Sequence, residues 1–376
     1  MAIVGISESQ CGRGVELTPL QHQALAAQKA LNDAGLNKSD VDAVMTTDVV
    51  GLPSLKVAEY LGIKPRFTDT TITGGSAFVV FVERAALAIA AGLCEVVLIT
   101  YGSSLWSDRS RLSEQAALDP RMSAAQFEWP YGDFSPISSY SLAAMRHMYE
   151  YGTTSEQLAE VAVASRRWAM LNPDALLRDP ITVNDVIEST MIASPFHKLD
   201  CCLMTDGGGA VVVTSAERAR DLRRSPVFLL GSGFSATHLN ITQMEDLTVS
   251  GAKESGRQAF ARAAVTPNDI DVVETYDSFT FSVILAMEDL GFCKKGEGGQ
   301  FVEGGRIGPG GSLPTNTSGG GLSYTHPGAL GIFLVIEAVR QLRGECMSRQ
   351  VPDAQLALVH GIGGWLSTHA TLILAR

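Results

Sequence analysis

The sequence predicts an α/β fold made of two topologically similar halves, with a separate segment inserted into the first half. Apolar strand-like runs alternate with helix-like segments over residues 1–100, and the order helix, strand, helix, strand returns over residues 251–374. Between them, residues 102–194 lack this alternation and are rich in Ser, Met, Tyr, Trp and Pro. A chain of 376 residues, of which 45% are hydrophobic, can bury a core large enough for two or three domains.

The first half shows the clearest local signals. A helix is predicted over residues 18–35, because a Thr-Pro pair starts it, apolar residues recur on one face and a glycine stops it. One right-handed βαβ crossover follows. It consists of a strand over residues 67–72, a Gly-Gly turn at 74–75, a buried helix over 76–92 and a strand over 95–100.

The inserted segment is expected to carry helices near residues 139–151 and 155–172, before strands resume at 209–214 and 226–233. The second half repeats the pattern of the first. Its predicted elements are helices over 251–264, 279–290 and 326–342, and strands over 272–276, 355–361 and 367–374.

Composition excludes several classes of function. Lys and Arg are scattered in a chain of net charge −11, so nucleic-acid binding is not expected. No apolar run reaches the ~20 residues that a membrane span needs, and no secretory leader opens the chain. The six cysteines form no CxxC pair and predict no metal site. A cytoplasmic protein without a bound metal is therefore expected.

Three motifs occur in a characteristic order. Residues 194–209 (Ser-Pro-Phe-His-Lys-Leu-Asp-Cys-Cys-Leu-Met-Thr-Asp-Gly-Gly-Gly) combine an LDCC-type segment with a turn before a strand. Residues 316–328 (Asn-Thr-Ser-Gly-Gly-Gly-Leu-Ser-Tyr-Thr-His-Pro-Gly) form an NxxGG…HP loop, and residues 360–364 (His-Gly-Ile-Gly-Gly) form a C-terminal glycine loop. Together they resemble the thiolase superfamily, and most closely its sterol-carrier-protein thiolase branch.

This resemblance implies a thiolase fold: a five-layered αβαβα architecture of two similar halves with an inserted loop (cap) domain. The expected domains are residues 1–115 plus 195–224 for the N-terminal half, 116–194 for the inserted domain and 225–376 for the C-terminal half. Such proteins are usually dimers that bind acyl-CoA. The resemblance thus implies a homodimer with no permanently bound cofactor, and coenzyme A only as part of the substrate.

The family's nucleophile is missing. Thiolases acylate a cysteine at the N-terminus of the buried first-half helix, where the helix dipole lowers the thiol pKa. Here the turn reads Thr-Gly-Gly-Ser over residues 73–76, so the former nucleophile position falls at Gly75, next to Ser76. Ser76 has no base placed by the sequence and is predicted to be an N-cap or first-turn residue of the helix. The second family cysteine, in the last glycine loop, is also absent, so acyl transfer is disfavoured.

Two tyrosines stand in the loops that retain family motifs. Tyr276 occupies the place of a histidine in an HDxF-like motif, and Tyr324 lies two residues before His326. This pattern resembles the cysteine-less, lipid-transfer-protein-type steroid side-chain aldolases of the superfamily. The resemblance implies retro-aldol cleavage of a β-hydroxyacyl-CoA to a ketone and a short acyl-CoA such as propionyl-CoA. One tyrosine would take the β-hydroxyl proton, and the other would protonate the enolate carbon.

Further residues are assigned supporting roles. His326 is the candidate donor to the thioester oxygen in an oxyanion hole. His360 and Asn316 are candidates to supply or orient other donors, and Asp277 either orients a catalytic group or caps the helix that follows it. Both tyrosine hydroxyls are expected to meet at one point near His326.

Two other functions compete with the aldolase. A thiolase or C-acyltransferase acting on a 3-oxoacyl-CoA would need an acylated cysteine, and a non-catalytic acyl-CoA-binding subunit would need no tyrosine. The aldolase resemblance also implies a small partner with an OB fold and a zinc ribbon, forming a heterotetramer. Bulky apolar residues near the cap either hold a steroid ring system or form the cap's own core or dimer contact. They are Trp106, Met122, Phe127, Trp129, Tyr131 and Phe134.

Overall fold

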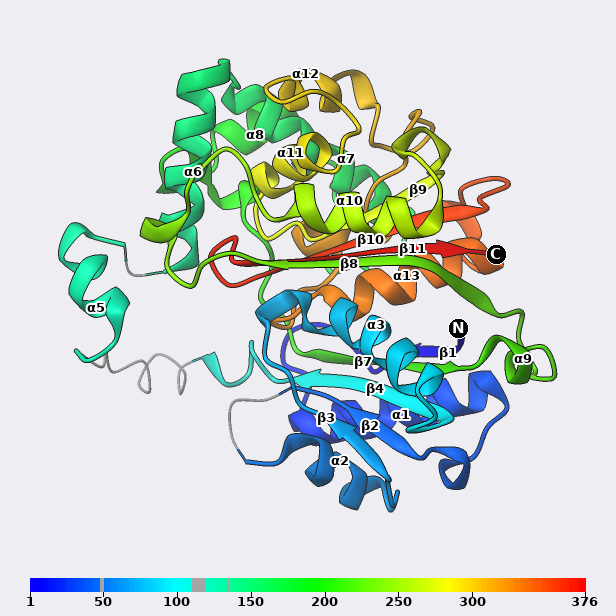
Figure 1. The fold of residues 1–376 in the computed structure, drawn as a ribbon. Helices are drawn as coiled ribbons and strands as arrows, with labels where there is room; N and C mark the ends of the chain where they lie inside the picture. The colour runs from blue at the N-terminus through cyan, green and yellow to red at the C-terminus, as the bar shows by residue number, and fades with distance from the viewer. Residues whose placement is uncertain (48–50, 110–119, 134) are drawn as a thin grey trace.

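The computed structural model describes residues 1–47, 51–109, 120–133 and 135–376. Phe134, and the domain boundary expected between residues 115 and 116, lie outside these described residues. The chain forms two stacked α/β halves, with the helices of the inserted segment beside the second half (Figure 1).

The first half begins and ends on adjacent strands. The predicted first helix is confirmed: the Thr18 hydroxyl accepts a hydrogen bond from the Gln21 N–H, and Gly35 ends the helix in the left-handed conformation. The elements of this half are β1 (Ala2–Glu8), α1 (Pro19–Ala34), β2 (Ala43–Met45), α2 (Pro53–Leu61), β3 (Phe67–Asp69), α3 (Ala77–Ala90), β4 (Val96–Ser103), β7 (Gly207–Thr214) and α9 (Ala216–Ala219).

The second half repeats this order, with one correction to a predicted helix. The helix expected to start at His326 begins at Gly331. Pro327 disfavours helical backbone at His326, so a loop separates this histidine from the helix. The elements are β8 (Val227–Ala236), α10 (Ala252–Ala263), β9 (Val272–Thr275), α11 (Thr280–Asp289), α12 (Gly298–Val302), α13 (Gly331–Arg343), β10 (Leu356–Gly363) and β11 (Thr368–Ala375).

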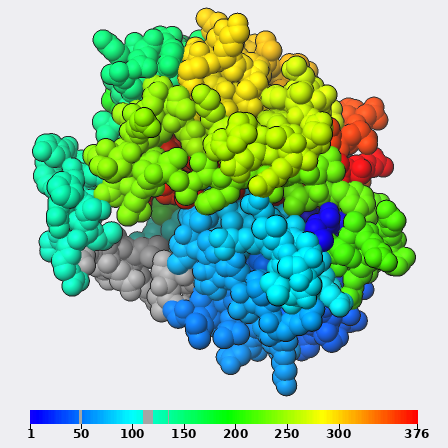
Figure 2. All heavy atoms as spheres, in the orientation of Figure 1, coloured from blue at the N-terminus to red at the C-terminus, as the bar shows by residue number. Residues whose placement is uncertain are grey.

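The inserted segment is mostly helical. It contains α5 (Ser123–Phe127), α6 (Pro136–Tyr151), α7 (Ser155–Met170) and α8 (Val183–Ile187), followed by a hairpin of β5 (Met191–Ala193) and β6 (Phe196–His197). Helix α5 projects from the body of the molecule (Figures 1 and 2). Phe127 and Tyr131 expose 62% and 88% of their surface, so these two aromatic side chains form neither a core nor the wall of a closed substrate site.

Sheet order confirms that the two halves are topologically alike. The described strands of the first half lie in the order β3-β2-β4-β7-β1, and those of the second in the order β9-β10-β11-β8. In the first half, β2 pairs in parallel with β3. In the second half, a single parallel bridge between Val273 on β9 and Thr315 takes the corresponding place. The two halves join into one nine-stranded sheet through only two residue pairs between β1 and β8.

Five layers result from this arrangement, as predicted. Helices α1 and α2 cover the outer face of the first half, and α10 and α11 lie over the outer side of the second. Helices α3 and α13 fill the space between the strands of the two halves (Figure 1). The N-termini of the two central helices meet, because a Cβ on Gly331 would lie 2.5 Å from the carbonyl oxygen of Gly75. Across the described residues, no helix has the length and apolar character needed to cross a membrane.

Candidate active site

A cavity of about 310 Å³ opens where the N-termini of α3 and α13 meet. Glycines and apolar side chains form most of its wall, including Gly75, Phe279 and Trp365. Its titratable and hydroxyl-bearing side chains are Tyr140, Cys202, Tyr276, Ser278 and His326. The cavity therefore brings together two of the three predicted catalytic residues, Tyr276 and His326.

Tyr276 and His326 are hydrogen-bonded to each other. Strand β9 ends at Thr275, and the Tyr276 N–H donates to the carbonyl of His360 on β10 at 2.9 Å, which fixes the start of the turn. The Tyr276 hydroxyl lies 2.9 Å from His326 Nε2 and accepts from the Leu330 N–H at 3.2 Å. The pair thus spans the two loops that precede α11 and α13.

Both members of this pair are uncharged at neutral pH. Burial raises the pKa of the Tyr276 phenol well above its usual value of 10. Burial also lowers the pKa of His326 to about 4. His326 Nδ1 is buried and has no hydrogen-bond partner. The site therefore offers neutral donors with unfilled hydrogen-bonding capacity, which is suited to an oxygen that becomes negatively charged during a reaction.

The tyrosine ring occupies the space of the missing nucleophile. A Cβ on Gly75 would lie 2.3 Å from Cε2 of Tyr276 and 2.5 Å from the carbonyl oxygen of Ile362. Both distances are far inside van der Waals contact. Any side chain at position 75, including a cysteine, would collide with Tyr276 in its observed position. A thiol at position 75 and the Tyr276 ring in its observed position therefore exclude each other.

Ser76 does not replace the cysteine. Its hydroxyl donates to the Thr73 carbonyl at 2.7 Å and lies 2.9 Å from the Thr368 hydroxyl. It is buried and does not line the cavity. No base contacts it, so its role is to hold the turn that starts α3.

Asp277 fixes the loop that carries His326. Its carboxylate accepts hydrogen bonds from the N–H groups of Gly321 at 2.7 Å and Leu322 at 3.2 Å. Burial raises its pKa to about 7, and these backbone donors oppose that shift. The residue at the N-cap of α11 is Phe279, so Asp277 orients the loop instead of capping the helix. On the other side, the Thr205 hydroxyl accepts from the His326 N–H at 3.1 Å.

His360 and Asn316 lie behind the site and do not line the cavity. His360 Nδ1 is 2.9 Å from the Thr275 hydroxyl, and its Nε2 is 3.1 Å from Nδ1 of His369. Asn316 Oδ1 accepts from the Thr275 N–H at 2.8 Å. Both side chains therefore hold the end of β9 and position Tyr276 from behind, without presenting a donor to the cavity.

Tyr324 is not brought to the cavity. It is buried, and burial together with the neighbouring Glu8 raises its pKa well above 10. The Glu8 carboxylate beside its hydroxyl is paired with Arg340, whose Nη2 lies 2.9 Å away. The expected meeting of both predicted tyrosines near His326 is thus not observed. The loop forms one π-helical turn over Gly320–Tyr324 before it becomes extended at Thr325, so spacing in the sequence did not predict the direction of Tyr324.

A different tyrosine shares the cavity with Tyr276. Tyr140 lies on α6 of the inserted segment, is 3% exposed and lines the cavity wall. The helical spacing of its buried face, which continues through Ala143, Ala144 and His147, indicates only that this side of α6 is covered. No sequence signal placed that face over the site.

No cysteine is prepared for nucleophilic attack. Burial raises the pKa of all six thiols, to about 11 for Cys94 and about 12 for Cys11, Cys201 and Cys293, and further for Cys202 and Cys346. Cys202 lines the cavity, where the neighbouring Asp277 raises its pKa as well. Within the described parts of the chain, no group of three or more His, Cys, Asp or Glu could hold a metal ion.

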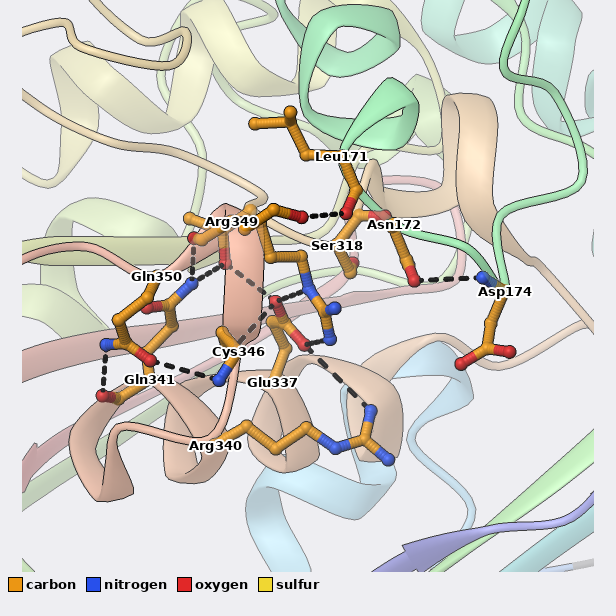
Figure 3. Close-up of polar contacts among 12 residues, drawn as sticks. Leu171, Asn172, Asp174, Ser318, Glu337, Arg340, Gln341, Cys346, Arg349 and Gln350 are labelled. Atoms are coloured by element: carbon orange, nitrogen blue, oxygen red, sulfur yellow. Dashed lines mark hydrogen bonds and ion pairs between the residues drawn. The ribbon is translucent and has the colours of Figure 1, made fainter.

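A second buried polar cluster surrounds Glu337 on α13 (Figure 3). Its carboxylate accepts from Arg349 Nε at 2.8 Å and Nη2 at 3.0 Å, and from the Thr317 hydroxyl at 2.9 Å. Gln341 donates to the Arg349 carbonyl at 2.9 Å. Burial acts to raise the Glu337 pKa, but the positive charges of Arg349 and Arg340 outweigh burial and hold the pKa below its usual value. This Glu337 cluster anchors α13 to the segment that follows it.

Comparison with known proteins agrees with the fold and the motifs. Residues 233–376 match the family model Thiolase C-terminal domain-like. The chain is 35% identical to an acetyl-CoA acetyltransferase of Methanothermobacter thermautotrophicus, over 100% of this chain and 99% of that protein. It is 37% identical to the 17-hydroxy-3-oxo-4-pregnene-20-carboxyl-CoA lyase of Mycobacterium tuberculosis, over 96% of each. The solved structure of the Ltp2-ChsH2(DUF35) aldolase superimposes with a TM-score of 0.90 and 34% identity, over 100% of this chain and 97% of that one.

The chain therefore belongs to the thiolase superfamily, in its sterol-carrier-protein-2-thiolase-like branch, and it is an enzyme of the acyl-CoA-handling kind that defines this superfamily. The predicted family and fold class are confirmed. Its relatives of comparable identity divide between an acyltransferase and carbon–carbon lyases.

Proposed function

We propose that this chain is a carbon–carbon lyase that cleaves a β-hydroxyacyl-CoA by a retro-aldol reaction. The observation that carries the proposal is the Gly75–Tyr276 contact, because it leaves no room for a thiol at the position where a thiolase needs its nucleophile. A lyase needs no covalent intermediate. It needs proton transfer and a donor to the thioester oxygen, and neutral Tyr276 and His326 suit both tasks.

The reaction requires no co-reactant. The β-hydroxyl gives up its proton, the Cα–Cβ bond breaks, and its electron pair moves onto the thioester as an enolate while Cβ becomes a ketone. The α-carbon then takes a proton, and a shorter acyl-CoA leaves. We assign proton transfer at the β-hydroxyl to Tyr276 and stabilisation of the enolate oxygen to His326. Because His326 would donate as a neutral imidazole, the site avoids burying a charged imidazolium beside the enolate.

We extend the proposal to a steroid side-chain substrate, supported by the 37% identity to a steroid-carboxyl-CoA lyase over nearly the whole chain. For 17-hydroxy-3-oxo-4-pregnene-20-carboxyl-CoA, cleavage beside the hydroxyl-bearing carbon would give a 17-ketone and propionyl-CoA.

We also propose a small OB-fold and zinc-ribbon partner in a heterotetramer around a homodimer, supported by the DUF35 component in the similar solved structure. Exposed apolar side chains on the inserted segment are consistent with such an interface. They are Met122, Phe127, Tyr131, Leu142 and Met145.

Acyl transfer is the alternative, favoured by 35% identity to an acetyltransferase over the full chain. It would have to use Cys202, since that is the cysteine among the described residues that line the cavity. Cys202 has a raised pKa and an acidic neighbour, which is the opposite of the environment that activates a thiol.

The test is product analysis by mass spectrometry. The chain, alone and with a DUF35-type partner, is mixed with 17-hydroxy-3-oxo-4-pregnene-20-carboxyl-CoA, and in parallel with a 3-oxoacyl-CoA plus free CoA. Propionyl-CoA and the 17-ketone from the first mixture, with no thiolysis in the second, support the lyase. Thiolysis of the 3-oxoacyl-CoA alone would overturn it.

A further inference from the structure

The proposed reaction removes a proton from the β-hydroxyl and adds one to the α-carbon, so a proton donor or acceptor is needed at each atom. The cavity contains a second phenol besides that of Tyr276. Building on the proposed lyase reaction, we propose that Tyr140 is the second catalytic tyrosine and delivers the proton to the α-carbon. This assigns a catalytic group to the inserted segment, which otherwise contributes only cover to the site.

The position of Tyr140 is fixed by its surroundings. Its ring packs against Phe279, which also lines the cavity, with centroids 4.9 Å apart and a tilt of 50°. Phe279 in turn stacks on Phe196 at 5.0 Å. Because Phe279 follows Tyr276 by three residues at the start of α11, this stack ties α6 to the same turn that carries the first tyrosine.

The Tyr140 hydroxyl retains capacity for a ligand. Its hydrogen bond to the Gly364 carbonyl is 3.4 Å long, near the limit at which such bonds contribute. The Ser278 hydroxyl and the Leu366 backbone lie close enough to lower its pKa, although burial dominates and raises it to about 12. Tyr140 and Tyr276 line the same cavity of about 310 Å³, so a substrate held there can reach both phenols.

Two protonated phenols suit a relay in which neither is charged at rest. The β-hydroxyl proton passes to the Tyr276 oxygen as Tyr276 releases its own proton toward Tyr140, directly or through one water. Tyr140 gives its proton to the α-carbon. The net change is one proton moved from the β-oxygen to Cα, and both tyrosines end as phenols. Such a relay avoids a standing phenolate in a buried site, which burial disfavours.

The test compares Tyr140→Phe with Tyr149→Phe, in the full chain with its partner present. Both residues lie on α6, but Tyr149 is 83% exposed, so its variant controls for loss of a hydroxyl from the same helix. Phenylalanine at position 140 keeps the packing on Phe279. We expect Tyr140→Phe to lower kcat by about 10²–10³-fold, with KM changed less than about threefold, and Tyr149→Phe to match wild type.

A second readout separates catalysis from structure. Propionyl-CoA incubated together with the 17-ketone in D₂O should exchange its α-hydrogens by the reverse relay, in which the ketone oxygen accepts the proton. This exchange should occur in the wild-type enzyme and in Tyr149→Phe, and should be lost in Tyr140→Phe at an unchanged melting temperature. An active wild type whose Tyr140→Phe variant still cleaves and exchanges would overturn this inference alone. A wild type that cleaves no β-hydroxyacyl-CoA would contradict the proposed function itself.

Discussion

The cavity pair and the Glu337 cluster are both buried and polar, yet they differ in every property that matters for chemistry. Tyr276 and His326 are neutral, border an open cavity, and leave His326 Nδ1 without a partner. Glu337 and Arg349 are charged and bonded on several sides (Figure 3), and neither lines that cavity. Burial alone therefore does not mark a functional group. The roles that we propose for Tyr276 and His326 therefore rest on unfilled hydrogen-bonding capacity beside a cavity.

Tyr324 shows why this distinction is useful. By motif it belongs with Tyr276, but in space its hydroxyl lies beside Glu8, the ion-pair partner of Arg340, and Arg340 in turn approaches Glu337 at 3.9 Å. It thus lies at the edge of the Glu337 cluster and outside the cavity.

The largest expected effect is on Tyr276. Tyr276→Phe keeps the ring that packs on Gly75 but removes the hydroxyl, so kcat should fall by about 10²–10⁴-fold, the usual range for loss of an acid–base group. The melting temperature should change by no more than a few degrees. Steady-state kinetics and calorimetry measure both, and a variant with wild-type kcat would remove Tyr276 from the mechanism.

His326→Ala should rank second. It removes the proposed donor to the enolate oxygen, and loss of one such donor costs about 10²–10³-fold in kcat. Because Tyr276 would remain, cleavage should be slowed and not abolished. If KM rises while kcat is retained, His326 only helps to bind the ester.

Arg349→Met should affect stability and spare the chemistry. It leaves the Glu337 carboxylate buried without its main partner, which typically costs about 3–5 kcal/mol. Denaturant unfolding measures this loss, while kcat of the folded enzyme should stay at the wild-type value. A large kcat defect in a fully folded variant would erase the contrast between the two clusters.

The loss of stability in Arg349→Met should depend on pH. In the wild-type protein the folded-state pKa of Glu337 is lowered, so its stabilising contribution is complete above its usual pKa of 4.5 and is lost as the pH falls through the folded-state pKa. Without Arg349 the carboxyl is more easily protonated. The stability difference between wild type and Arg349→Met should therefore shrink as the solution is acidified below about pH 4.5.

The smallest expected effect is that of pH on kcat, which should be absent over part of the alkaline range. His326 has a lowered pKa of about 4 and stays neutral above it, and Tyr276 has a pKa raised above 10 and stays protonated below it. Between about pH 8 and 9.5 neither group changes its charge, so kcat should be constant there. A rise in kcat with a midpoint inside this range would instead indicate a tyrosine whose pKa is lowered, acting as a phenolate base.

Much of this architecture was predictable from local sequence signals. The Thr18 cap, the Gly35 stop and the repeated order of elements indicated the two halves. The absence of a cysteine at Gly75 is the sequence observation from which the proposed lyase chemistry starts. These features depend on short-range rules and on motifs that occupy fixed places in the fold.

The remaining features depend on tertiary placement. Tyr140 reaches the cavity because α6 packs over the start of α11, and no periodicity in the sequence encodes that docking. The direction of Tyr324 follows from a π-helical turn in a glycine-rich loop, where spacing along the chain does not determine which way a side chain points. The contact between Gly75 and the Tyr276 ring joins residues 201 positions apart, and only the folded chain displays it.

The central claim is that the Tyr276 ring has replaced the thiol nucleophile and that cleavage proceeds without an acyl-enzyme. Its most direct test is the rate of short acyl-CoA release from a β-hydroxyacyl-CoA as free CoA is varied from zero upward, with the intact protein mass recorded during turnover. We predict a rate that is independent of free CoA and a protein mass that never increases. A rate that vanishes without CoA, together with an acyl adduct on Cys202, would contradict the account.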